Sequence, residues 1–261
     1  MVKIGIIGCG NLGLSILSGI QHNMTDVQLF GSKRDLAKLE EFEQVNTTFT
    51  TDNELLIKES DIIVIALKPY TLLSFLETHS SLLDPERHTI VSCATGITLE
   101  QIQSAIKAPI GIYRAMPNTA AAVNESVTAI SCTSDPLNRK EMIDKIFASL
   151  GTVIHIDEAL MESATILGAC GVAYVLRFMR AMIQGGIEVG FNAQTATDIV
   201  SQTMKGAAEL IIQNGTHPEE EIDKVTTPKG CTIVGLNEME HAGFSSALIK
   251  GIVASYNKIE R

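Results

Sequence analysis

The chain opens by joining a buried-strand pattern to a glycine-rich turn. Val2–Ile7 is apolar and rich in β-branched residues, and Gly8-Cys9-Gly10-Asn11-Leu12-Gly13 follows at the start of an amphipathic segment. In this setting Gly8 would allow a tight turn, Gly10 would let the backbone approach a pyrophosphate, and Gly13 would let the helix pack closely on the strand. The free N–H groups at the helix start would then face the phosphates. These features predict a dinucleotide-binding α/β unit.

Short apolar runs alternate with amphipathic segments through the first half of the chain. The runs that suit strands are Val2–Ile7, Val27–Phe30, Ile62–Leu67 and Ile90–Cys93, with Ile110–Tyr113, Val127–Ser131 and Val153–Ile156 as further candidates. The segments that suit helices are Leu12–His22, Arg34–Gln44 and Leu72–Glu77. Continuous β-branched runs are typical of strands buried on both faces of a parallel sheet. The alternation predicts an α/β fold with a doubly wound, mostly parallel sheet.

The pattern changes near residue 157, after which apolar residues recur at helical spacing. The predicted helices are Glu158–Val189, Ala193–Gln213, Gly230–His241 and Ser245–Lys258. We therefore predict a Rossmann domain over residues 1–156 and an all-α domain over residues 157–261. Within the long helix, Ala164–Met182 is apolar around much of its circumference and contains small residues. The apolar side chains of such a helix have to be buried against another surface, so we expect it to form a homodimer interface.

Composition and charge argue against several other classes of protein. The 261 residues carry 20 Lys and Arg against 30 Asp and Glu, a net charge of −10 that disfavours nucleic-acid binding. The five cysteines form no Cys-x-x-Cys pair, which is typical of reduced cytosolic thiols and not of a disulfide framework or a zinc site. No apolar run reaches ~18 residues without a polar break, and the amino terminus lacks signal-peptide features. We expect a cytoplasmic protein without a metal or a membrane span.

The turn after the second predicted strand indicates which nicotinamide cofactor is preferred. NAD-binding proteins place a carboxylate there for the ribose hydroxyl, whereas this chain reads Gly31-Ser32-Lys33-Arg34. A hydroxyl and two cations suit a 2′-phosphate, which favours NADPH and leaves NADH possible. The alternative is an ordinary charged loop in solvent, since Lys and Arg are common in turns.

Three further loops should line the same crevice, because the carboxyl ends of parallel strands meet at one edge of a sheet. They are Ala66-Leu67-Lys68-Pro69, Cys93-Ala94-Thr95-Gly96 and Arg114-Ala115-Met116-Pro117-Asn118-Thr119. Their small residues leave room for a flat ring. Lys68 taken alone could equally be a surface lysine.

A second candidate anion site lies in the helical half, at Pro228-Lys229-Gly230-Cys231-Thr232. Proline is favoured in the first turn of a helix, and the unpaired N–H groups beyond it suit an anion. Thr227 precedes the proline and is predicted to cap the helix. On these residues alone, a helix start without a ligand is an equally good interpretation.

The motifs together resemble the pyrroline-5-carboxylate reductase family, over essentially the whole chain. They are the glycine turn, Leu67-Lys68-Pro69, Met116-Pro117-Asn118-Thr119 and Val225-Thr226-Thr227-Pro228-Lys229-Gly230-Cys231-Thr232, in this order. The resemblance implies a Rossmann domain followed by a helical domain that dimerises, in a family whose dimers often assemble further into a decamer. It also implies NADPH-dependent reduction of a cyclic imine that bears a carboxylate, as the last step of proline synthesis.

The resemblance also implies roles for individual residues. The implied cofactor-binding residues are Gly8, Gly10, Asn11, Leu12, Gly13, Ser32, Lys33, Arg34, Asn53, Leu67, Lys68, Pro69, Ala94, Asn118 and Cys170. The implied substrate-binding residues are Thr227, Gly230, Cys231 and Thr232, of which Thr232 is the catalytic candidate. The chain departs from the family twice: Ala169-Cys170-Gly171-Val172-Ala173-Tyr174 replaces Gly-Ser-Gly-Pro-Ala-Tyr, and Lys229-Gly230 replaces a double glycine. Lys229 either adds a charge near the substrate or points to solvent, and we favour solvent.

Two other functions fit parts of the pattern. A β-hydroxyacid dehydrogenase has a similar layout, but that family places a catalytic lysine soon after a glycine-rich turn in the interdomain helix. Here Gly168–Gly171 is followed by Val-Ala-Tyr-Val-Leu-Arg, with no lysine. A non-catalytic nucleotide sensor would keep the glycine turn but would not need the segment Thr227–Thr232.

Overall fold

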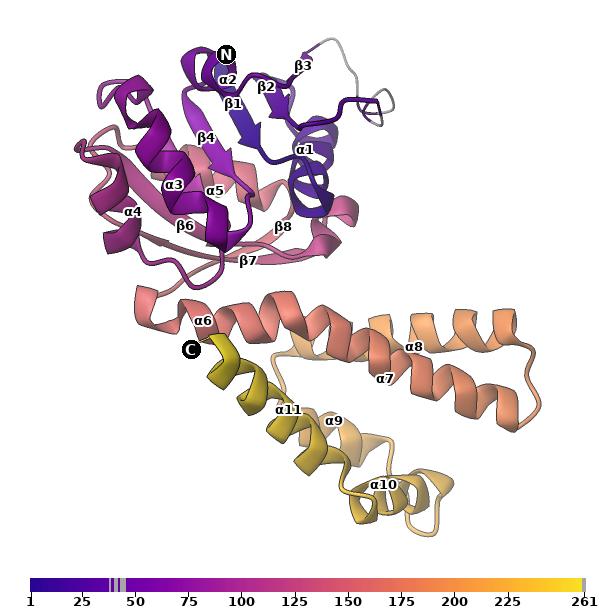
Figure 1. The fold of residues 1–261 in the computed structure, drawn as a ribbon. Helices are drawn as coiled ribbons and strands as arrows, with labels where there is room; N and C mark the ends of the chain where they lie inside the picture. Colours follow the sequence, from indigo (N-terminus) through magenta and orange to yellow (C-terminus); the bar gives the residue numbers. More distant parts are fainter. Residues whose placement is uncertain (38, 40–41, 43–45, 260–261) are drawn as a thin grey trace. The chain divides into compact units, whose positions relative to one another are not determined.

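The computed structural model describes residues 1–37, 39, 42 and 46–259, and its chain forms two compact units (Figure 1). The first unit is Met1–Val172 with Lys258–Arg261, and the second is Ala173–Asn257. The last strand ends at His155, just before the boundary expected between residues 156 and 157. That domain boundary stays a prediction.

The first unit is built on one eight-stranded sheet with the order β3-β2-β1-β4-β5-β6-β7-β8. Its strands are β1 Val2–Ile7, β2 Val27–Ser32, β3 Thr47–Thr50, β4 Ile62–Ile65, β5 Thr89–Ser92, β6 Gly111–Met116, β7 Ser126–Cys132 and β8 Gly151–His155. All neighbours are parallel except β6 and β7, so the predicted mostly parallel sheet is confirmed. The strand order reverses between β1 and β4, and in such sheets ligands bind outside the carboxyl ends at this point.

Two apolar clusters, one on each face of the sheet, hold helices against it. Helices α1 Asn11–Asn23 and α5 Lys140–Ala148 cover one face, and α2 Asn53–Glu59, α3 Pro69–His79 and α4 Leu99–Ile106 cover the other. Within β4, Ile62 and Val64 join the first cluster while Ile63 and Ile65 join the second. This alternation is why the strands read as continuously apolar, because successive side chains enter opposite cores.

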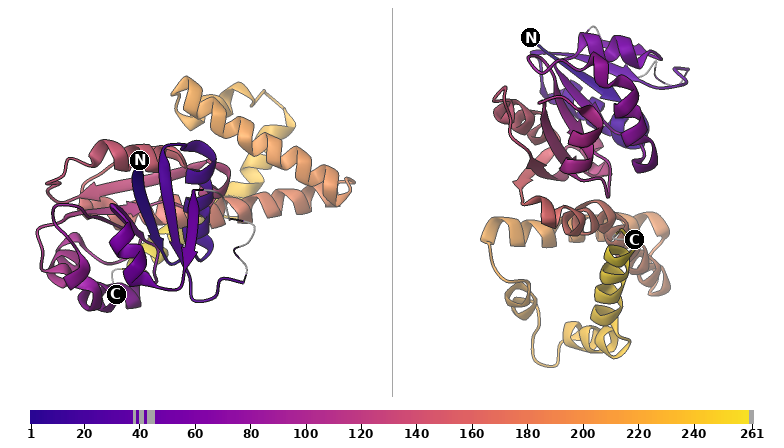
Figure 2. Two further views of the ribbon diagram at one scale, coloured as in Figure 1. Left: turned by 90° about the horizontal axis from the view of Figure 1, so that it is seen from above. Right: turned by 60° about the vertical axis from the view of Figure 1, so that its left-hand side comes forward.

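The predicted long helix Glu158–Val189 is not uniformly α-helical. A 3₁₀ turn at Glu158–Leu160 leads into α6 Met161–Ala164, then into a π-helical segment Thr165–Cys170, and then into α7 Gly171–Glu188. The second unit continues with α8 Ala193–Asn214, α9 Pro218–Lys224, α10 Cys231–His241 and α11 Phe244–Ile259. No strand follows His155 among the described residues, and Figure 2 shows only helices and loops in the second unit.

Several elements were not predicted from the sequence, although capping residues marked two of them. Asp52 accepts hydrogen bonds from the N–H groups of Glu54 and Leu55 at the start of α2. Thr98 and Gln101 form a capping box at the start of α4. Strand β3 and helices α5 and α9 were also missed. The predicted helix Arg34–Gln44 is wrong for residues 34–37, which form a bend and turn, and its residues 38, 40, 41, 43 and 44 lie outside the described residues.

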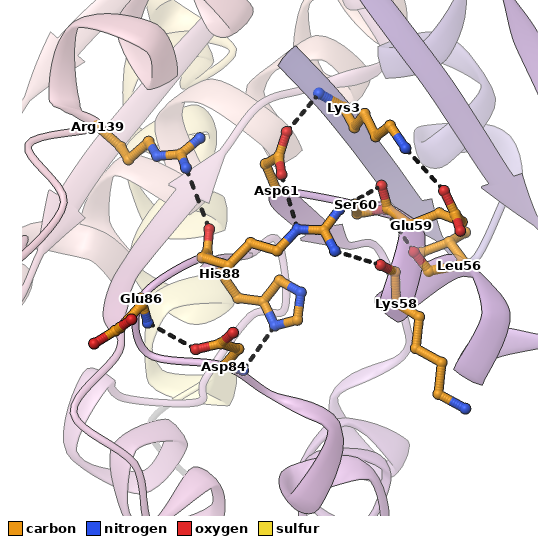
Figure 3. A network of polar contacts seen from close by, with 11 residues as sticks. Lys3, Leu56, Lys58, Glu59, Ser60, Asp61, Asp84, Glu86, His88 and Arg139 are labelled. Atoms are coloured by element: carbon orange, nitrogen blue, oxygen red, sulfur yellow. Dashed lines mark hydrogen bonds and ion pairs between the residues drawn. The ribbon is translucent and has the colours of Figure 1, made fainter.

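At the amino ends of the strands, away from the glycine turn, a polar network joins the loops of the sheet (Figure 3). Asp61 accepts from the backbone N–H of Lys3 and from Nε of Arg87, both at 3.0 Å. Arg87 also donates to the carbonyl groups of Lys58 and Glu59. Burial raises the pKa of Asp61, but the bonds from Lys3 and Arg87 outweigh it and hold that pKa below its usual value. The network therefore fixes the base of the sheet away from the candidate site.

Candidate active site

The glycine turn lies at the carboxyl end of β1. Gly8 has a φ of +94°, which favours glycine, and the carbonyl of Ser32 accepts from the N–H groups of Gly8 and Cys9 at 3.2 and 2.8 Å. The turn is thereby fixed to the end of β2. Burial raises the pKa of the Cys9 thiol to about 12, so the side chain in this turn stays neutral at physiological pH.

The other two glycines differ in how much space surrounds them. A Cβ on Gly13 would lie 2.4 Å from the carbonyl oxygen of Gly8, so only glycine lets α1 approach the turn this closely. A Cβ on Gly10 would meet no atom within 4 Å, which leaves the backbone open to a ligand. The N–H groups of Asn11, Leu12 and Gly13 precede the first intrahelical bond, from Leu14 to Gly10. This geometry fits a pyrophosphate at the helix start.

The end of β2 offers cations and no carboxylate. Ser32 is buried at the last position of the strand, and Lys33 and Arg34 follow, partly buried and exposed respectively. A Cβ on Gly31 would lie 2.6 Å from the ring of Phe49, so this position has no room for an acidic side chain. Asn53, the residue implied on the adenosine side, is the first residue of α2, which starts soon after β3, the neighbour of β2.

The loops after β4 and β5 reach the same edge of the sheet. Lys68 is exposed at the N-cap position of α3, between the partly buried Leu67 and Pro69. Ala94 follows β5 and is only 2% exposed, so it forms part of the floor of this edge. The structure thus brings the residues implied at these loops to the carboxyl edge that also carries the glycine turn.

Asn118 follows β6 and is buried, at 6% exposure. Its Oδ1 accepts from the N–H of Ala120 at 2.9 Å, and its Nδ2 donates to the carbonyl of Gly168 at 3.0 Å. Both ends of the amide are therefore used within the protein, a role that the sequence prediction did not include. Cys170 ends the π-helical segment that contains Gly168 and is partly buried.

Sequence reasoning missed a buried arginine beside these loops. Arg114 of β6 is 2% exposed and donates to Glu158 at 3.1 Å and to Glu162 at 2.6 Å. Glu158 also accepts from the N–H of Leu99 at 2.6 Å, which joins the start of α4 to the start of the long helix. The available signal was a single charged residue within an otherwise apolar strand, because such a residue is rarely buried unless it is paired.

The implied substrate segment lies in the second unit, where one local prediction is wrong. Helix α10 begins at Cys231 with Gly230 as its N-cap, so Thr227 is not the cap and Pro228 is not in the helix. Instead the N–H of Gly230 donates to the carbonyl of Thr227 at 2.9 Å and closes a turn around Pro228 and Lys229. The cause is the left-handed backbone at the exposed Lys229, whose φ is +60°.

The helix start itself is nevertheless present at Cys231 and Thr232. These residues occupy the first two positions of α10, whose N–H groups precede the intrahelical bonds. Cys231 is exposed and Thr232 is partly buried, so both can be reached by a small ligand. The arrangement can bind an anion through backbone N–H groups and place a hydroxyl beside it.

Among the described residues, no group of three or more His, Cys, Asp or Glu side chains is arranged to hold a metal ion. One helix, Glu158–Glu188, is long and apolar enough to cross a membrane by length and composition, and 17% of its most apolar window is buried within the chain. The sequence analysis predicted no membrane span and did not identify this helix as a candidate. Its exposed face includes Leu167 and Leu176, at 65% and 58% exposure.

Family models match both parts of the chain. Residues 158–261 match a model described as pyrroline-5-carboxylate reductase dimerisation. Residues 3–96 match a model described as NADP oxidoreductase, coenzyme F420-dependent. The first match covers the helical half, and the second covers the glycine turn and the loops after β2, β4 and β5.

Similar proteins extend this likeness over nearly the whole chain. The chain is 41% identical to pyrroline-5-carboxylate reductase 1 of Dictyostelium discoideum over 98% of its own length, but it spans only 49% of that relative. It is 40% identical to reductase 2 of the same organism, over 98% of this chain and 91% of the relative. The crystal structure of a Plasmodium falciparum pyrroline carboxylate reductase with NADP bound is 25% identical, covers 99% and 97% of the two chains, and superimposes with a TM-score of 0.89.

The family resemblance inferred from the motifs is thus confirmed by sequence and by fold. The matches include the sheet with its glycine turn and the helical half with its Thr-Pro-Lys-Gly-Cys-Thr segment. This chain belongs to the pyrroline-5-carboxylate reductase family.

Proposed function

We propose that this protein reduces 1-pyrroline-5-carboxylate to L-proline with NADPH. Family membership makes it an NAD(P)H-dependent oxidoreductase, and the 40% identity to a named reductase over 98% of the chain is the observation that carries the choice of reaction. The cyclic imine bearing a carboxylate is the substrate that suits a helix start beside a hydroxyl. NADPH, when bound, supplies the hydride that reduces the C=N bond.

The residues of the first unit fit this cofactor. The open backbone at Gly10 and the free N–H groups at the start of α1 would hold the pyrophosphate. Ser32, Lys33 and Arg34 would hold the 2′-phosphate, because charge-assisted hydrogen bonds to a phosphate need donors and no competing carboxylate. The net charge of −10 gives no general attraction for an anion, so these local donors have to supply it.

The residues of the second unit fit the substrate. The N–H groups of Cys231 and Thr232 would bind the carboxylate, and the Thr232 hydroxyl would face the ring nitrogen. A protonated imine is already a strong electrophile, so the protein mainly has to orient it and exclude water. Hydride adds to the imine carbon, and the electron pair of the C=N bond moves to nitrogen, which keeps its proton as an amine.

We expect the loss of both cations after β2 to weaken NADPH binding selectively. Lys33→Ala with Arg34→Ala should raise the KM for NADPH by an amount equivalent to ~1–3 kcal/mol, because charge-assisted bonds to the 2′-phosphate are lost. The KM for NADH, which lacks this phosphate, should change little. Steady-state kinetics with both cofactors measure the difference. The matched control removes two charges from α5, with Lys140→Ala and Lys145→Ala, and equal effects on both cofactors would show that the loop does not read the phosphate.

Oxidation of NADPH in the presence and absence of the cyclic imine tests the proposed reaction. We expect oxidation that depends on the imine and yields proline. A β-hydroxyacid dehydrogenase would instead act on hydroxy acids, and a nucleotide sensor would bind NADPH without oxidising it. Either of those outcomes would exclude the proposal.

We also propose that the helical half forms a homodimer, from which the decamer implied by the resemblance would assemble. The apolar side chains Leu167, Val175 and Leu176 are 65%, 47% and 58% exposed on the long helix, more apolar surface than an isolated chain usually leaves uncovered. Sedimentation at micromolar concentration should therefore give a dimer or a larger assembly. A stable monomer would contradict this prediction.

We retain the cytoplasm as the proposed location. All five cysteines are free, as expected in a reducing compartment, and they are Cys9, Cys93, Cys132, Cys170 and Cys231. Burial of the apolar helix Glu158–Glu188 against a second copy of the chain would account for its composition without a membrane. Cell fractionation would test this, and recovery with membranes would contradict it.

A further inference from the structure

The first unit contains a π-helical segment, Thr165–Cys170. π-Helices are rare, and those that interrupt an α-helix are frequently found at functional sites. Such a segment needs contacts that favour its wider turn over the α-helix that continues on both sides. The structure supplies these contacts from the loop after β6 and from β7.

The central contact is a hydrogen bond from Asn118 to the middle of the segment. Nδ2 of Asn118 lies 3.0 Å from the carbonyl oxygen of Gly168, and the asparagine is 6% exposed. A side chain that donates into the hydrogen-bond ladder of a helix is a known cause of departure from α-helical geometry. The donor is buried and Gly168 is partly buried, so loss of the bond would leave a partly buried acceptor without this donor.

Asn118 is itself held rigidly. Its Oδ1 accepts from the N–H of Ala120, and its own N–H donates to Oγ of Ser126 at 3.0 Å. Gly168 has no side chain to keep the sheet away, since a Cβ there would lie 3.2 Å from Val127 of β7. The next residue, Ala169, packs against the apolar cluster that contains Met116. The segment is therefore fixed to the ends of β6 and β7 on both sides of the amide contact.

We propose that Asn118 is a positioning residue, which holds Thr165–Cys170 in its π-helical form by donating to Gly168 and so fixes Cys170 for the reaction. The contribution to the reaction rests on the proposed function, because the family resemblance implies that Cys170 binds the cofactor. The structural part does not rest on it. This role does not require a direct contact between the Asn118 side chain and the cofactor, because both of these bonds lie within the protein.

Asn118→Asp separates the two bonds of this side chain. The variant keeps an oxygen that accepts from Ala120, and aspartate is as good an N-cap as asparagine. It replaces the donor to Gly168 by an acceptor that faces a carbonyl. At pH 8 we expect kcat for imine reduction to fall by about ten- to a hundredfold, as for a partly buried acceptor that loses its donor. The KM for NADPH should change by less than about threefold.

Two readouts separate positioning from general destabilisation. The first is the rate at which iodoacetamide alkylates Cys170, followed by peptide mass spectrometry, which should rise at least severalfold, while the rate at the exposed Cys132 stays unchanged. The second is the kcat of Asn118→Asp divided by that of the wild-type protein, measured at pH 8 and again at pH 5.5. Burial raises the pKa of a carboxyl group, so the introduced group should become protonated at the lower pH and donate to Gly168 again, and the ratio should rise.

Two further variants complete the experiment. Asn118→Ser keeps a capping oxygen but is too short to reach Gly168, so it should reproduce the loss without adding a charge or recovering at low pH. Asn192→Asp makes the same chemical change at the N-cap of α8, which accepts from Thr195, and should alter neither readout. Wild-type kcat and an unchanged Cys170 rate in both Asn118 variants would overturn the proposal. So would a fall in kcat that accompanies a fall in unfolding midpoint while the Cys170 rate stays unchanged.

These outcomes are distinguishable from failure of the proposed function. If the wild-type protein does not reduce the imine, the alkylation rates still test whether Asn118 holds the segment. If the wild-type protein is active and both Asn118 variants behave like it, the proposed function stands and the positioning role of Asn118 is wrong.

Discussion

Replacement of Arg114 by methionine should lower the free energy of unfolding by about 3 kcal/mol, at the low end of the range for breaking a buried ion pair. Arg114 is 2% exposed and donates to both Glu158 and Glu162, at 3.1 and 2.6 Å. Removal of the guanidinium group leaves two carboxylates close together without their counter-ion. The expected loss is at the low end of that range because water can still reach the two carboxylates, whose side chains are 32% exposed in Glu158 and 20% exposed in Glu162. Urea denaturation followed by circular dichroism measures the loss.

A matched change at the other end of the sheet provides the control. Arg87 also pairs with a carboxylate, Asp61, at 3.0 Å, but its side chain is 37% exposed. Arg87→Met should therefore cost only about 1 kcal/mol, as expected for a pair that water partly screens. Addition of Glu162→Gln to Arg114→Met should recover part of the stability, because it removes one of the unpaired charges. Equal losses in the two arginine variants would show that burial of the Arg114 ion pairs adds no stability.

Thr232→Val should lower kcat for imine reduction by roughly ten- to a thousandfold, in the lower range for a positioned proton-transfer or hydrogen-bonding group. Valine keeps the shape of threonine and removes only the hydroxyl that would face the ring nitrogen. The charge on that nitrogen disappears as the hydride arrives, so a hydroxyl that accepts a hydrogen bond from the iminium acts where the reaction changes most. Steady-state kinetics with saturating imine measure the effect.

Cofactor binding should be nearly unchanged in Thr232→Val, because Thr232 is proposed to hold the substrate and not the cofactor. Titration of NADPH fluorescence checks this point. Thr78→Val is the matched control, since its hydroxyl donates to the carbonyl of Ser74 within α3 and serves no substrate. If Thr232→Val keeps full kcat, the threonine is only a residue at the start of α10.

The sheet and its glycine turn could be predicted because their signals are local. A strand buried on both faces reads as an apolar run, and Gly8, Gly10 and Gly13 each occupy a position whose geometry limits the choice of residue. Strand β3 has the opposite character: Thr47–Thr50 is short and polar and lies at the sheet edge, so hydropathy gave no signal. The start of α2 was missed although Asp52 marks it, because the prediction relied on hydropathy alone.

The details of the candidate site depended on contacts that are distant in the sequence. Arg114 pairs with residues 44 and 48 positions away, and Asn118 bonds to Gly168 across 50 positions. No local pattern specifies such partners. The N-cap of α10 was misplaced for a different reason: a proline after threonine suits both a helix start and a tight turn. The turn forms here because Lys229 adopts a left-handed backbone. Lysine rarely adopts this conformation, so its presence did not predict the turn.

Transfer of deuterium from the cofactor tests the central claim most directly. NADPH deuterated at both C4 positions, incubated with the wild-type protein and 1-pyrroline-5-carboxylate, should give one L-proline for each NADPH oxidised. Mass spectrometry and NMR should find one deuterium in that proline, on the ring carbon that was the imine carbon. NADPH oxidation that does not depend on the imine, or proline without deuterium at that carbon, would contradict the assignment of this protein as an NADPH-dependent imine reductase.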